Sequence, residues 1–212
     1  MIRENKKTII ITAIVTLLPI LAGVILWDKL PETMATHFGT RSDADGFSGK
    51  AFAVFGLPFI LLGVHLLAAF VTAADPRKKN ISPKMYSLVL WLIPIISVIM
   101  NAVIYAWNLG YQIRVTYIVQ LLLGVSFIII GNLLPKARQN YTIGIKTPWA
   151  LASEENWNRT HRLAGWLWTA GGLVILIFTF CGVSPGWLIA VLAALALVPC
   201  IYSAWLHAAR GI

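Results

Sequence analysis

Long apolar stretches separated by short polar segments run through the chain of 212 residues. Each stretch holds about 20 residues, enough at a rise of about 1.5 Å per helical residue to cross a hydrocarbon core roughly 30 Å thick. The pattern predicts six transmembrane helices, at roughly 8–27, 51–73, 85–107, 115–134, 162–181 and 187–208. We therefore expect an all-α integral membrane protein whose two termini lie on the same side of the membrane.

The composition supports this class, because 58% of the residues are hydrophobic and only 12% are charged. A soluble domain carries about 25% charged residues. No polar segment is long enough for a separate soluble domain, so we expect one membrane domain. Within it we expect an N-terminal two-helix unit over 1–84 and a C-terminal four-helix unit over 85–212. The two cysteines, Cys181 and Cys200, lie in apolar runs and are interpreted as small hydrophobic residues.

The net charge of +9 is distributed unevenly between the two predicted sides of the membrane. Thirteen of the 17 basic residues fall on the side of the termini, whereas the acidic residues divide evenly. The thirteen are Arg3, Lys6, Lys7, Arg77, Lys78, Lys79, Lys84, Lys136, Arg138, Lys146, Arg159, Arg162 and Arg210. The positive-inside rule places both termini in the cytoplasm. Membrane orientation accounts for the basic excess, so we expect no direct contact with nucleic acid.

Two polar segments stand out between the spans, an outer loop over 28–50 and a cytoplasmic loop over 135–160. In the cytoplasmic loop, Ser153 followed by two glutamates is typical of a helix start, with a hydroxyl cap and acids near the positive end of the dipole. We expect this helix to continue into the fifth span. Trp157, Thr160, His161 and Ala164 would then share one helical face.

A metal site is the first chemical hypothesis for a chain with four histidines. His37 and His161 are predicted on opposite sides of the membrane and cannot share a metal. His37, Asp43 and Asp45 could bind a hard cation, but the spacing lacks the full calcium-loop pattern, and turn formation is the favoured interpretation. We expect no metal and no cofactor.

Three polar residues fall inside predicted spans. His65 is either functional or a neutral imidazole bonded to a neighbouring helix, and the sequence leaves both open. Asn101 and Gln120 are expected at similar depth in the hairpin of the third and fourth spans, bonded to each other for about 1 kcal/mol or less.

Small residues mark the last two spans, among them Gly165, Thr169 and Gly172. Small residues let helix backbones approach closely. Packing between the fifth and sixth spans is the favoured interpretation. Homodimerisation uses the same chemistry, so the oligomeric state stays open.

Known catalytic patterns are absent: the chain has no nucleophile elbow, no phosphate-binding loop and no paired intramembrane aspartates. We therefore expect no enzyme. The alternative is an intramembrane enzyme or transporter that acts on a lipid or peptide through His65 or His161.

Both polar segments resemble known families. The outer loop, with Leu30-Pro-Glu, Thr36-His-Phe-Gly and Asp45-Gly-Phe, resembles a bacterial domain of unknown function (DUF1648-like). The cytoplasmic segment carries a second motif with many polar positions at fixed spacing: Asn132, Asn140, Gly144, Lys146, Thr147, Pro148, Trp149, Trp157, Thr160, His161 and Arg162. This motif resembles the C-terminal signature of the SdpI family of bacterial immunity proteins. Lys146 departs from the arginine expected in many relatives, which weakens any bidentate role there.

The resemblance implies a multi-pass protein of the bacterial cell membrane that protects the cell from a secreted, membrane-acting toxic peptide. It also implies a receptor that holds a cytoplasmic transcriptional repressor at the membrane. We expect the outer loop, through His37, Asp43, Asp45 and Phe47, to sense the peptide and the cytoplasmic loop to respond.

A purely interfacial role is the alternative for the cytoplasmic loop. In it, Trp149 and Trp157 anchor the interface, while Lys146, Arg159 and Arg162 meet phosphates of the membrane lipids.

Overall fold

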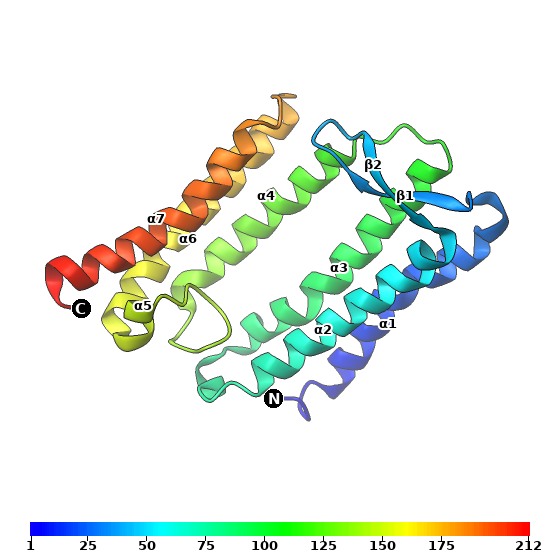
Figure 1. Cartoon of the computed structure of the whole chain (residues 1–212). Helices are drawn as coiled ribbons and strands as arrows, with labels where there is room; N and C mark the ends of the chain where they lie inside the picture. The colour runs from blue at the N-terminus through cyan, green and yellow to red at the C-terminus, as the bar shows by residue number, and fades with distance from the viewer. The chain divides into compact units, whose positions relative to one another are not determined.

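The structure is a computed structural model that describes all 212 residues, and six of its helices are long and apolar enough to cross a membrane. These helices are α1 (Lys6–Ile25), α2 (Leu57–Ala73), α3 (Pro83–Asn108), α4 (Val115–Leu133), α6 (Glu154–Phe180) and α7 (Trp187–Arg210) (Figure 1). The predicted all-α membrane fold is confirmed. The side of the membrane on which the termini lie stays a prediction.

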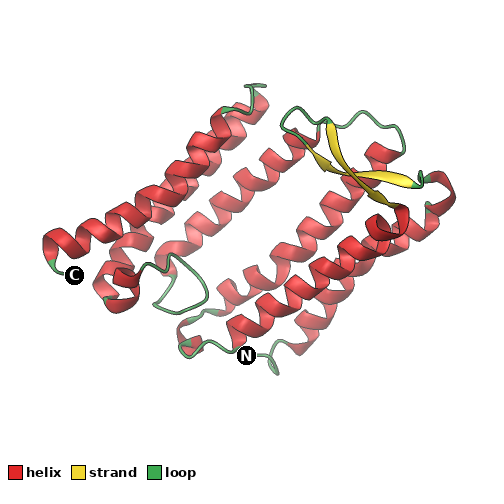
Figure 2. Cartoon of the chain, in the orientation of Figure 1, coloured by secondary structure: helices red, strands yellow, loops and turns green.

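The polar loop over 28–50 contains a β-hairpin that the sequence did not predict (Figure 2). Strand β1 (Thr33–Phe38) pairs with the antiparallel strand β2 (Ala44–Gly49), and the register shifts around His37. A short π-helix (Phe52–Gly56) then leads directly into α2. The remaining short elements are the 3-10 turns Trp27–Lys29, Lys78–Asn80 and Leu134–Lys136 and the one-turn helix α5 (Pro148–Ala152).

The chain forms two compact units. The first unit comprises Met1–Ala74 and Tyr86–Thr116, and the second comprises Asp75–Met85 and Tyr117–Ile212. Most of α3 therefore belongs with α1, α2 and the hairpin, whereas the sequence grouped the third span with the C-terminal helices.

An apolar cluster in the first unit fixes the hairpin on the helix ends. Met34 of β1 is fully buried against Val54 of the π-helix and against Ile104 and Tyr105 of α3. Deeper in the same unit, the Ser97 hydroxyl donates to the Thr16 carbonyl at 2.8 Å. The hairpin is thus an integral part of the first unit, and its packing leaves one face outward.

Glycine residues determine how α4 and α6 meet in the second unit. A Cβ added to Gly172 would lie 2.6 Å from the carbonyl oxygen of Gly124. A Cβ added to Gly165 would lie 2.8 Å from the carbonyl oxygen of Gly131. The two backbones therefore touch with no side chain between them. The fifth and sixth spans do pack together as expected, with Gly171 of α6 against Leu195 of α7, but Gly165 and Gly172 are not part of that contact. Both face α4, because its own glycines allow the closer approach.

We predict that Gly172→Ala destabilises the protein, because the new methyl group overlaps backbone atoms that have no room to move. The expected loss in free energy of unfolding is about 1–3 kcal/mol, as for other overpacked cores. Denaturant titration of the purified protein in mixed micelles measures it. Gly63→Ala is the matched control, because a Cβ there meets nothing within 4 Å. Equal stability of the two variants would contradict the packing described here.

Candidate functional site

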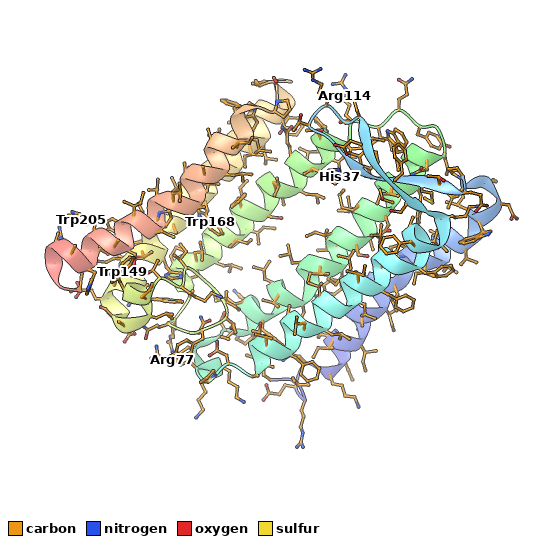
Figure 3. The ribbon with its side chains drawn as sticks, in the orientation of Figure 1. His37, Arg77, Arg114, Trp149, Trp168 and Trp205 are labelled. Carbon is orange, nitrogen blue, oxygen red and sulfur yellow. The ribbon has the colours of Figure 1, made fainter.

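The polar segment between α4 and α6 folds into a compact structure that we call the motif loop (residues 137–153). The Thr147 hydroxyl accepts a hydrogen bond from the Ala150 amide at 3.1 Å and starts α5. The Ser153 hydroxyl accepts from the Asn156 amide at 3.2 Å and starts α6, which confirms the predicted helix start and its continuation into the fifth span. Figure 3 shows Trp149 of this loop and Arg77 at the same end of the second unit.

Two stacked aromatic side chains of α6 support the motif loop. Trp157 and His161 are buried, and their rings stack with centroids 3.9 Å apart. The His161 Nδ1–H donates to the Trp157 carbonyl at 2.8 Å, and its Nε2 accepts from the Ile145 amide at 3.0 Å. The Trp157 indole donates to the Ala137 carbonyl at 2.7 Å. These bonds require the neutral imidazole with its proton on Nδ1, and they leave no ring nitrogen free.

Gly144 is required where the loop passes over this stack. Its φ of +120° lies in a region that L side chains rarely adopt, and a Cβ there would overlap His161 Nε2. Only glycine lets the backbone come close enough for the bond from Ile145 to His161.

Asn140 holds the turn together from inside. Its buried amide oxygen accepts from the backbone amides of Thr142 at 3.0 Å and Ile143 at 2.7 Å. Its amide nitrogen donates to the carbonyls of Arg138 at 2.9 Å and Ile143 at 3.1 Å. One side chain thus satisfies four backbone groups that have no helix or strand to pair with.

Asp75 ties the loop between α2 and α3 to the motif loop. Asp75 is only 2% exposed. Its carboxylate accepts hydrogen bonds from the Arg77 amide at 2.7 Å, and from the Tyr141 amide and the Thr142 hydroxyl at 2.9 Å each. The carboxylate forms no ion pair, so these three donors replace its hydration. Sequence reasoning missed Asp75, because an acid in a basic loop looks like an ordinary surface residue.

Gln139 makes a second connection between the same two loops. Its amide nitrogen donates to the Ala150 and Leu151 carbonyls at 2.8 and 3.0 Å, and its amide oxygen accepts from the Arg77 guanidinium. The Arg77 guanidinium also lies 5.0 Å from the centroid of the Tyr141 ring. The 75–80 loop and the motif loop are therefore one structural piece.

A buried polar network joins the motif loop to α7. The Ser203 hydroxyl donates to Asn156 Oδ1 at 2.7 Å and lies 2.6 Å from the Thr147 hydroxyl. Thr160 also donates to Asn156 Oδ1, at 3.1 Å. This buried hydrogen bond gives Thr160 a structural role. Ser203, which the sequence did not single out, is the contribution of α7.

The remaining motif residues lie at the surface. Asn132, Lys146, Pro148 and Arg162 are exposed, and half-buried Trp149 stacks on His207. The proposed interfacial anchoring by Trp157 is wrong, because its side chain is completely buried.

An open groove of about 770 Å³ follows the first turns of α6, lined by Glu154, Asn158, Arg159 and Tyr202 among others. Both signs of charge are present in this groove, and Arg159 pairs with Glu155 at 2.6 Å.

On the hairpin, two of the four outer-loop candidates meet. His37 Nδ1 lies 2.5 Å from Asp45 Oδ1, and both side chains are more than half exposed. The Asp43 backbone carbonyl accepts from the Gly39 amide at 2.9 Å, as a turn residue does. The chain contains no group of three or more histidine, cysteine or acidic side chains placed to hold a metal. Phe47 stands 60% exposed.

The end of α3 holds the hairpin and forms a groove with it. The Asn108 side chain accepts from the Ala35 amide at 2.8 Å and donates to the Ala35 carbonyl at 3.0 Å. Beside this contact is an open groove of about 470 Å³. Its lining residues carry no charge and include three aromatic side chains: Pro31, Thr33, Phe47, Trp107, Asn108, Gly110, Tyr111 and Gln112.

The intramembrane polar residues have local partners. His65 is buried, and its Nε2 lies 3.0 Å from the Thr12 hydroxyl of α1, while Nδ1 has no partner. Asn101 donates to the Ser97 carbonyl at 2.8 Å, and Gln120 accepts from Thr179 at 3.3 Å. Asn101 and Gln120 belong to different units, and a bond between them stays a prediction.

We predict that Asp75→Asn loosens the motif loop, because an amide nitrogen cannot accept the bonds that the carboxylate oxygen accepts. Losing buried bonds to a charged group costs about 1–3 kcal/mol locally. Hydrogen exchange of the Tyr141 and Thr142 amides should therefore accelerate by about tenfold or more. The exposed Asp28, substituted as Asp28→Asn, serves as the control and should leave these rates unchanged. Unchanged exchange in Asp75→Asn would exclude the carboxylate as the connection between the loops.

Comparison with known proteins matches two segments of the chain. Residues 136–203 match the SdpI/YfhL protein family, and residues 14–62 match a domain of unknown function, DUF1648. The chain is similar to the Immunity protein SdpI of Bacillus subtilis (strain 168), with 26% identity over 178 residues that cover 82% of each chain. No solved structure matches.

The first match contains the whole motif loop, all of α6 and most of α7, and the second contains the hairpin. The two segments that carried the sequence resemblance are thus the segments matched here. With six apolar helices, the chain is a multi-pass protein of the bacterial cell membrane. Its resemblance to the SdpI family, accompanied by an N-terminal DUF1648 domain, is confirmed.

Proposed function

We propose that the protein is a membrane immunity protein that protects a bacterial cell from a secreted toxic peptide. Its similarity to a protein named for immunity, over 82% of both chains, supports this function. The single structural observation that carries the proposal is the uncharged aromatic groove beside the hairpin. A peptide that acts on membranes exposes apolar side chains, and this groove offers Phe47, Trp107 and Tyr111 to receive them.

The groove is suited to recognition because it is held in place beforehand. Asn108 fixes the backbone of Ala35, and Thr116 donates its amide to the Ser42 hydroxyl at 3.0 Å. A preformed surface loses little conformational entropy on binding. His37 and Asp45 lie on the same hairpin and would supply polar contacts at the rim of the bound peptide.

The distribution of basic residues supports an orientation in which this groove faces the outside and the motif loop faces the cytoplasm. In that orientation the motif loop is the output surface, and its partner is a soluble transcriptional repressor. The mixed charges along the groove of Glu154, Asn158 and Arg159 would give such a partner complementary contacts that fix its orientation.

A catalytic role finds less support. Both ring nitrogens of His161 are engaged with backbone groups, and its side chain is 1% exposed. His65 is buried and contacts the Thr12 hydroxyl, as expected for an imidazole bonded to a neighbouring helix. Neither side chain offers a free, accessible group for chemistry on a lipid or peptide.

We predict opposite accessibility for the two polar loops. In a Cys181→Ala/Cys200→Ala background, Asp45→Cys should react with a membrane-impermeant thiol reagent in intact cells. Lys146→Cys should react only after the cells are permeabilised. The reverse pattern would contradict the orientation, and labelling of both positions in intact cells would contradict it as well.

We predict that the protein raises survival of a sensitive bacterium exposed to a membrane-acting peptide toxin, and that Phe47→Ala/Tyr111→Ala lowers this survival by about tenfold or more. Removing two aromatic anchors costs at least the 1.4 kcal/mol that corresponds to tenfold weaker binding. Phe59→Ala, which removes an exposed aromatic ring from α2, is the control at equal membrane expression.

The two parts of this proposal fail separately. A wild-type protein that protects against no such peptide would contradict the immunity function. Full protection by the double variant would leave immunity standing and show that the aromatic groove does not receive the peptide.

A further inference from the structure

A second groove, of about 390 Å³, lies where α4 and α6 meet beside the motif loop. Its lining comes only from these two helices and the 3-10 turn that follows α4. The lining residues are Gly131, Asn132, Pro135, Lys136, Arg162, Gly165, Trp166 and Thr169. Apart from Asn132, Lys136 and Arg162 the lining is largely apolar, and within it Gly131 and Gly165 bring the two backbones into contact.

Two cations at the groove have no partner of opposite charge. Lys136 and Arg162 are exposed, and neither lies within 4.0 Å of a carboxylate. Arg159, one turn away on α6, is paired with Glu155. Asn132 adds an exposed amide without a protein hydrogen-bond partner. The groove therefore has a cationic end that is ready to receive an anion.

From this cationic end, exposed apolar side chains continue along both helices. On α4, Ile129 and Val125 follow Asn132 at helical spacing and are 45% and 46% exposed. On α6, Trp166 and Leu173 follow Arg162 on the same face and are 75% and 49% exposed. Residues three, four, seven and eleven apart line one side of a helix. The cationic end and the two apolar stripes therefore match the layout of a phospholipid, which has a charged headgroup and two acyl chains.

We propose that this groove binds an anionic phospholipid, with the headgroup phosphate between Lys136 and Arg162 and the acyl chains along the stripes of α4 and α6. Basic pockets between transmembrane helices recognise anionic headgroups in this manner. The guanidinium of Arg162 donates to the phosphate oxygens, and the Lys136 ammonium adds a compact positive charge. The exposed indole of Trp166 beside this end of the groove suits a lipid interface, where tryptophan is enriched.

A lipid suits the groove better than a soluble anion. A free phosphate would use only the cationic end and would leave Ile129, Val125 and Leu173 without a role. The proposal is independent of immunity, since it rests only on the groove and the two helices that form it.

The test uses the purified full-length protein, delipidated in detergent and titrated with lipid under native mass spectrometry. Wild-type protein should retain phosphatidylglycerol at least about tenfold more tightly than phosphatidylcholine with the same acyl chains. Lys136→Ala/Arg162→Ala should lose this preference, whereas Lys136→Arg/Arg162→Lys should keep most of it. Lys78→Ala/Lys79→Ala removes two exposed charges elsewhere in the second unit and should behave as wild type. Circular dichroism checks that all variants remain folded.

Three results would overturn the proposal. The first is equal retention of the two lipids by the wild type. The second is an unchanged preference in folded Lys136→Ala/Arg162→Ala. The third is soluble glycerol phosphate that binds as tightly as phosphatidylglycerol, which would identify a site for a free phosphate instead of a lipid.

Discussion

Backbone groups that leave a helix near a membrane must find hydrogen-bond partners, and this constraint shapes the second unit. The motif loop has only one helical turn of its own, so buried side chains supply its partners. Asn140 satisfies four backbone groups, Asp75 holds Tyr141, and His161 holds Ile145. The polar residues that stand out in the sequence here are mostly engaged in building the loop. Only the solvent-facing surface of the motif loop is left available for a partner.

The first unit meets the same constraint with fewer residues. The outer edge of β1 would present unpaired backbone groups, and Asn108 occupies both groups of Ala35. An apolar cluster beneath the hairpin completes the attachment. The two units therefore differ in character. The motif loop uses its polar groups internally, whereas the hairpin holds Phe47 and the His37–Asp45 pair toward the surroundings.

Local features of this chain could be read from its sequence, and long-range ones could not. The six spans follow from apolar length alone, and the start of α6 follows from Ser153 and the acids after it. The shared face of Trp157, Thr160 and His161 follows from helical spacing, and all three are buried.

Contacts between segments distant in the chain could not be predicted from the sequence. The hairpin carries glycines and aspartates with little strand alternation, so its residues resemble a loop. Asp75 acts on residues 66 and 67 positions away, and nothing local indicates this. The sequence also left open an interfacial position for Trp157, because a tryptophan near a span end suits either the interface or the core.

The glycine contacts between α4 and α6 also bear on how these helices can move. Gly124 faces Gly172, and two turns along Gly131 faces Gly165, so the backbones are in register at two successive points. Sliding one helix past the other would bring Ile128 or Thr169 into a space that admits no side chain. The contacts therefore oppose sliding of one helix along the other. A shift of either helix along its axis would carry its neighbour, and with it the motif loop that joins them.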